Sequence, residues 1–93
     1  MFINASSLQS VVLACKRISK ESCNPETRAF AYDVFTAFKM KMDTEPLAIR
    51  YMIHDEHATE FKDVILQLIF CLCLNQELED DMFTLCKVAD EHQ

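Results

Sequence analysis

Apolar residues recur at intervals of three and four positions along nearly the whole chain, which is the spacing of one face of an α-helix. The first run predicts a helix over roughly residues 6–20, where Ser6 and Gln9 resemble a capping box. A second helix is predicted over roughly residues 25–42; it starts with a proline and has Asn24 as its N-cap. No segment shows the alternation of a β-strand, so the sequence predicts an all-α protein.

The segment 45–74 has Pro46 just inside its start, and from Leu47 to Leu72 it keeps this helical spacing with no helix breaker in between. It forms either one long helix or two helices that break at the sequence HDEHAT. A break is favoured because Asp55 or Thr59 can cap a new helix, and because a helix of about 30 residues has no short domain to lie against. A last helix is predicted after Asn75. Residues 1–93 are therefore expected to form a single compact bundle of four to five helices.

The most apolar part of the chain is Val64–Leu74, whose one polar member is Gln67. A helix that is apolar nearly all the way round is typical of one surrounded by other helices, so this segment is predicted to be the central helix of the bundle. Asn75 is expected to end it and to cap the next helix. Glu77 and Glu79 would then lie in the first turn of that helix, where the positive end of the helix dipole favours acids.

The chain contains no glycine and only two prolines, and 51% of its residues are hydrophobic. Tight hairpin turns need residues with positive φ, so the lack of glycine argues against strands joined by such turns. It also excludes the glycine-rich loops that bind phosphates and dinucleotides. The hydrophobic fraction is high even for a small domain that needs a dense core, so part of it is available to face a partner.

Two features of the sequence argue against a membrane protein. The first residues carry no basic group before their short apolar stretch, which is unlike a signal peptide. The longest apolar run, Val64–Leu74, is well short of the ~18 residues of a membrane span. We therefore expect a cytoplasmic protein with no membrane contact.

The chain has five cysteines, an odd number: Cys15, Cys23, Cys71, Cys73 and Cys86. Four of them lie inside apolar periodic segments. A cysteine in such a segment behaves as a small hydrophobe, and cytosolic thiols stay reduced, so buried free thiols are expected. The pair at positions 71 and 73 would point about 200° apart on a helix and could not bind one zinc ion together.

The acidic side chains are concentrated in the second half of the chain. Residues 1–54 have a net charge of +2 and residues 55–93 a net charge of −8, which gives −6 overall. This acidic cluster has two interpretations. It can speed the encounter with an oppositely charged partner. The simpler interpretation is a solvated surface that keeps the protein soluble. The predicted partner-binding residues are Glu56, Glu60, Asp63, Glu77, Glu79, Asp80 and Asp81.

Candidate catalytic chemistry is sparse. His54 and His57 are three positions apart, unlike the four of an HExxH zinc motif. Glu60 and Asp63 have the ExxD spacing that metal-dependent helical nucleotide pyrophosphatases use, but the paired-glutamate motif that precedes it in them is missing. A polar junction between helices explains the same residues. We expect no metal, no cofactor and no catalytic residue, and hence no enzyme.

Direct binding of nucleic acid is also not expected. Lys16, Arg17 and Lys20 form one basic cluster, but they lie where cations suit the end of a helix. The chain as a whole is acidic, with a pI near 4.9. Carboxylates one helical turn apart, about 5 to 6 Å, have instead a spacing close to that of phosphates along a strand, which suits mimicry of nucleic acid.

These observations predict a small binding protein that inhibits a basic protein partner. Examples of the class are an immunity protein that blocks a nuclease toxin and an inhibitor that mimics nucleic acid. The first alternative is a regulatory or structural homodimer, and the second is a metal-dependent helical hydrolase. A homodimer contact could be formed by Phe2, Ile3, Ala48, Ile49, Met52 and Ile53.

Overall fold

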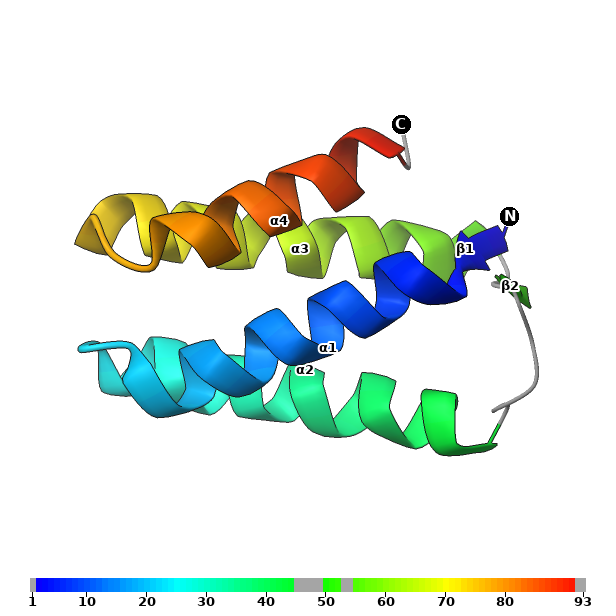
Figure 1. Cartoon of the computed structure of the whole chain (residues 1–93), viewed down its shortest axis with the longest axis horizontal. Coiled ribbons are helices and arrows are strands. Elements are labelled where there is room, and N and C mark those ends of the chain that lie inside the picture. The colour runs from blue at the N-terminus through cyan, green and yellow to red at the C-terminus, as the bar shows by residue number, and fades with distance from the viewer. Residues whose placement is uncertain (1, 45–49, 53–54, 92–93) are drawn as a thin grey trace.

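The computed structural model describes the backbone of residues 2–44, 50–52 and 55–91, and the side chains of residues 6–40, 42–43 and 61–91. Within these ranges the chain forms four helices and one pair of short strands (Figure 1). In chain order they are β1 (Phe2–Asn4), α1 (Ala5–Glu21), α2 (Pro25–Thr44), β2 (Arg50–Met52), α3 (Asp55–Asn75) and α4 (Glu79–Glu91). The predicted all-α bundle is confirmed, with the strand pair as an addition at one end.

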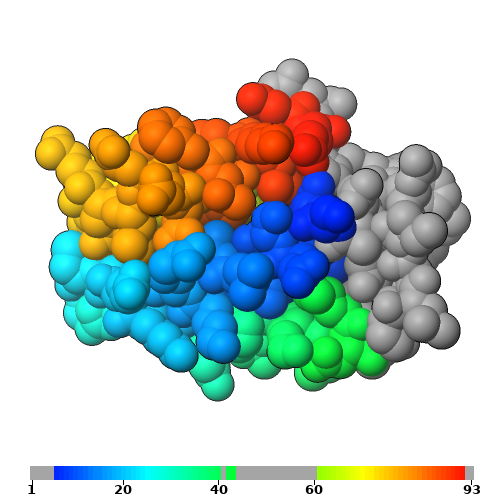
Figure 2. Space-filling view, viewed as in Figure 1, coloured from blue at the N-terminus to red at the C-terminus, as the bar shows by residue number. Residues whose placement is uncertain are grey.

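The helices form two antiparallel pairs, α1 with α2 and α3 with α4, and the pairs join where α1 packs against α4 (Figure 1). On the face shown in Figure 2 the surfaces of α1 and α4 meet without a gap. Helices α2 and α3 contact each other more weakly than the other neighbouring helices do. Helices α1 and α3 do not pack directly against each other and lie diagonally across the bundle. None of the described helices combines the length and hydropathy needed to cross a membrane.

The core is built from the apolar faces that the periodicity predicts. The fully buried large side chains are Leu8, Val11, Cys15, Ile18, Phe61, Ile65, Leu68, Leu72 and Leu85. Phe61 meets Phe38 of α2 edge to face, with 5.2 Å between ring centroids. The predicted cap of α2 is also confirmed, because Asn24 Oδ1 accepts hydrogen bonds from the backbone N–H groups of Glu26 and Thr27, at 2.8 and 3.1 Å.

The favoured break in the segment 45–74 is confirmed, because α3 begins at Asp55. The prediction of helix was wrong for Arg50–Met52, which pairs antiparallel with Phe2–Asn4. Three residues are too few to show strand periodicity. The partner strand also lies far away in the sequence, at the start of the chain. Residues 45–49 and His54 lie outside the described part of the chain.

The connection from α3 to α4 differs from the prediction. Asn75 does not cap α4; its Nδ2 donates to the carbonyl of Cys71 at 2.9 Å. The N–H groups of Gln76 and Glu77 bond back to the carbonyls of Cys73 and Leu72, the pattern of a Schellman motif. Its left-handed residue is Gln76, with a φ of 52°. A chain without glycine must place another residue there. Leu78 also has a positive φ, of 50°, and α4 starts directly after it, at Glu79.

Candidate partner-binding surface

Helix α3 has two apolar sides, and the bundle covers only one of them. Its inner side carries the buried residues Phe61, Ile65, Leu68 and Leu72. We define its outer face as the exposed residues Asp63, Leu66, Gln67, Phe70 and Leu74. The three large apolar members of this face are 46%, 62% and 68% exposed in chain order. The prediction of a central, fully surrounded helix was therefore wrong, because α2 packs on α1 and leaves α3 open on this side.

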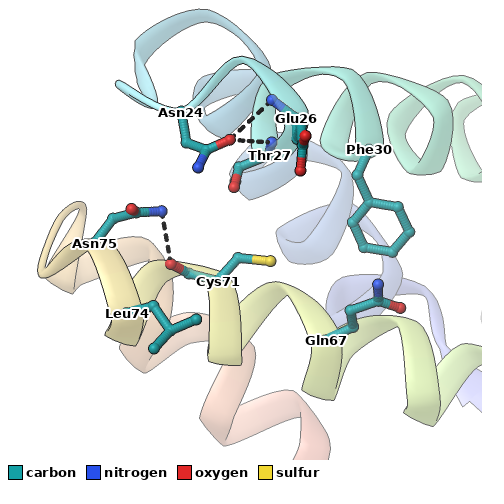
Figure 3. Close-up of a pocket in the computed structure, with 8 residues that line it drawn as sticks. All are labelled: Asn24, Glu26, Thr27, Phe30, Gln67, Cys71, Leu74 and Asn75. Atoms are coloured by element: carbon teal, nitrogen blue, oxygen red, sulfur yellow. Dashed lines mark hydrogen bonds between the residues drawn. The ribbon is translucent and has the colours of Figure 1, made fainter.

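A pocket of about 390 Å³ lies beside the outer face, between the start of α2 and the end of α3 (Figure 3). Phe30 of α2 and Gln67 of α3 point toward each other across it, and the thiol of Cys71 reaches into the same space. It is lined by Asn24, Glu26, Thr27, Phe30, Gln67, Cys71, Leu74 and Asn75. The pocket thus joins the apolar outer face at Leu74 and has a carboxylate, Glu26, on its opposite wall.

The turns at this end of the bundle are tied together by Glu77. Its carboxylate accepts hydrogen bonds from the Ser22 hydroxyl at 2.5 Å, and from the backbone N–H and the thiol of Cys23 at 3.0 Å each. Partial burial opposes ionisation, but these hydrogen bonds outweigh it and lower the pKa of Glu77. Glu77 thus connects the α1–α2 turn to the α3–α4 turn. Because these contacts use both of its carboxylate oxygens, Glu77 is not a free surface charge.

Asp81 is likewise an internal residue. It is 2% exposed, and both of its carboxylate oxygens lie 2.9 Å from Nε of Arg17, with Nη2 at 2.8 Å from one of them. The hydrogen bond and the charge of Asp81 raise the pKa of Arg17. The pair joins α1 to the first turn of α4. Asp81 therefore cannot lie on an exposed partner-binding surface, and Arg17 is not a free member of the predicted basic cluster.

The predicted acidic surface is accordingly smaller and differently placed. Of its members, Asp63, Glu79 and Asp80 are exposed. In the sequence, Asp63 precedes the apolar stripe, and the other two follow it beyond the α3–α4 turn. Asp80 lies toward α1, where its charge acts on Arg17. The side chains of Glu56 and Glu60 lie outside the described part of the chain, although their backbone belongs to α3. The exposed acids thus do not form one continuous wall, and only Asp63 belongs to the outer face of α3.

The five cysteines are unpaired, but they are less buried than predicted. Only Cys15 is buried, Cys71 and Cys86 are half-buried, and Cys23 and Cys73 are exposed. The prediction failed because apolar periodicity does not show which apolar sides of a helix are covered. Burial raises the pKa of the Cys15 thiol to about 12, and the nearby charge of Asp81 adds to the effect.

A thiol reagent applied to the native protein should therefore react with Cys73 first and with Cys15 last. Cys23 should fall between them, because its hydrogen bond to Glu77 raises the pKa of this exposed thiol. We expect Cys15 to react at least about a hundredfold more slowly than Cys73, and all five thiols to react after denaturation. Peptide mapping by mass spectrometry gives the order. Glu77→Gln should speed up Cys23 alone, and equal rates at Cys15 and Cys73 would contradict the described packing.

Two alternatives from the sequence fall largely on residues whose placement the structure does not describe. Among the described residues no group of histidine, cysteine and carboxylate side chains could hold a metal ion. His54 and the side chain of His57 lie outside that part. The same is true of the side chains of Phe2, Ile3, Ala48, Ile49, Met52 and Ile53, which were considered for a homodimer contact.

Leu66, Phe70 and Leu74, together with Phe30 in the pocket, are the candidate site residues that sequence reasoning did not single out. Their signal was present, because the three α3 residues recur every four positions, but the same run of sequence also contains the core residues. Only the packing distinguishes the two stripes. Comparisons of the chain with protein-family models, with curated proteins and with solved structures found no match.

Proposed function

We propose that this chain is a binding protein that neutralises a basic protein partner, and that the partner docks on the outer face of α3. The supporting observation is the exposed apolar stripe, which has Asp63 on the same face and Glu26 in the adjoining pocket. Protein interfaces typically combine a desolvated centre, often aromatic, with a polar rim. Here Phe70 supplies the centre, and Asp63 and Glu26 supply acidic groups beside it.

The charge of the rim selects the class of partner. Carboxylates at the edge of an interface attract cationic side chains and repel the phosphates of nucleic acid. A cytoplasmic inhibitor that covers the cationic cleft of a basic protein, such as a nuclease toxin, has this design, and so does an inhibitor that mimics nucleic acid. The same stripe could also serve a regulatory homodimer, but a symmetric contact of this kind would bring equal acidic rims together.

The first experiment is copurification from the native source followed by mass spectrometry of the bound proteins. The expected result is a basic protein retained in stoichiometric amount. A dimer of this chain with no other protein bound would contradict the proposal and favour the homodimer.

Reversing charge at Glu79 and Asp80 to lysine should then slow association with that partner by about tenfold or more at low salt, because steering acts on the encounter rate. Asp81 is left intact because its loss would break the internal pair with Arg17. The matched control is reversal of the exposed Lys16 and Lys20 to glutamate on α1. Stopped-flow kinetics between about 50 and 300 mM salt, where the Debye length falls from roughly 14 to 6 Å, give the rates. Equal effects of the two reversals would rule out a directed acidic surface.

A further inference from the structure

We propose that the partner presents a cationic amphipathic helix, which lies along the outer face of α3 and inserts one apolar side chain into the pocket between α2 and α3. This inference rests on the proposed function and specifies the recognition element. It is carried by three features of the described residues: the shape of the stripe, the pocket at its end and the charges around both.

The stripe has the shape of a helix-packing ridge. Leu66, Phe70 and Leu74 follow one another at intervals of four residues and span about 12 Å at 1.5 Å per residue. Such i, i+4, i+8 rows pack into the grooves of another helix in the commonest class of helix crossing. From Asp63 to Asn75 the surface is about 18 Å long, which matches a partner helix of roughly 12 residues. Proteins that recognise an amphipathic helix contact anchor residues at helical spacings of this kind.

The pocket supplies an anchor point at the end of the ridge. Its volume of about 390 Å³ is at the lower end of the roughly 300 to 1,000 Å³ typical of ligand pockets, which suits one large side chain. Asn24 and Asn75 hold its two rims through hydrogen bonds to the backbone, and Glu77 ties the adjoining turns together. The walls are thus ordered before the partner arrives, which lowers the entropy lost on binding.

The charges favour a basic helix over a second copy of this chain. Glu26 lines the pocket and Asp63 lies on the outer face, whereas the one basic side chain described on α3, Lys62, is half-buried and belongs to neither set. Two copies joined through α3 would place these carboxylates against each other. The exposed lysines Lys16 and Lys20 lie on α1, diagonally across the bundle, where a symmetric α3 contact could not use them.

A synthetic peptide of about 14 leucines and lysines arranged with helical period is a suitable probe of this surface. Fluorescence anisotropy should show that it binds the wild-type protein. Leu74→Ser should weaken binding at least about tenfold, because it removes an apolar contact at the edge of the pocket. The matched control is Leu13→Ser on α1, a leucine that is 52% exposed and should leave affinity within about twofold. Phe70→Ser on α3 and Phe83→Ser on α4 form a second matched pair, because the two side chains are 62% and 61% exposed. Phe70→Ser should weaken binding, and Phe83→Ser is its control.

Two further peptides separate the amphipathic helix from charge alone. The same leucines and lysines in alternating, strand-like order should bind at least about tenfold more weakly, and so should the helical peptide with glutamate in place of lysine. Equal binding of the helical and alternating peptides, or equal losses in Leu74→Ser and Leu13→Ser, would overturn the inference. If the inference fails in this way, the proposed function is still supported by a copurified basic partner whose association slows when Glu79 and Asp80 are replaced with lysine. Sedimentation that shows a wild-type dimer abolished by Leu74→Ser would overturn both.

Discussion

Replacing Leu72 with alanine should lower the free energy of unfolding by about 2 to 5 kcal/mol, whereas replacing Leu74 should change it by less than about 0.5 kcal/mol. The two leucines are two positions apart on α3, but the first is fully buried and the second is 68% exposed. Truncating Leu72 leaves a cavity among the core side chains. Truncating Leu74 removes atoms that already contact water.

Urea unfolding monitored by circular dichroism measures both values, and the pair serves as its own control for the chemistry of the substitution. The slope of the unfolding free energy with urea should be similar for the two variants. A loss at Leu74 that equals the loss at Leu72 would mean that the outer face of α3 is covered in the isolated protein. The free docking surface would then not exist.

Replacing Arg17 with methionine should destabilise the protein by about 2 to 3 kcal/mol, because it leaves the buried carboxylate of Asp81 without its partner. Breaking a fully buried ion pair costs about 3 to 5 kcal/mol. The smaller value is expected here because the Arg17 side chain is 55% exposed, so water can partly replace it. Methionine retains much of the apolar stem, and the loss therefore reports mainly on the charge.

A double-mutant cycle with Asp81→Asn isolates the interaction and should give a coupling energy of at least about 1 kcal/mol. The matched control is Lys39→Met, which breaks the exposed pair with Asp43 at 3.2 Å and should change stability by less than about 0.5 kcal/mol. Independent, additive effects of Arg17→Met and Asp81→Asn would show that the pair does not join α1 to α4.

The sequence was sufficient to predict those helices whose signals are local. Asn24 caps α2 as predicted, and the buried residues of α1 and α3 recur at the helical spacing seen in the sequence. The strand pair was missed because β1 and β2 are three residues each and their pairing is long-range. The start of α4 was missed because a left-handed Gln76 carries out the role that glycine usually has at the end of a helix.

The candidate site could be predicted only in part. Counting charges located the acidic half of the chain but could not show that Asp81 would meet Arg17, which lies 64 positions earlier. It also could not show that Glu77 would be used in joining two turns. Likewise the apolar run of α3 was visible, but which of its sides would stay open depends on α2 packing on α1. Local patterns do not contain the arrangement of helices around the bundle.

The most direct test of the proposed docking surface is an amide NMR titration of the isotope-labelled protein with the copurified partner. The predicted result is that the largest shift changes fall on residues 63–75 of α3 and on the first turns of α2, where Glu26 and Phe30 line the pocket. Residues around Leu13 on α1, diagonally across the bundle, should change little. Changes concentrated on α1, with α3 and the pocket unaffected, would contradict docking on the outer face of α3.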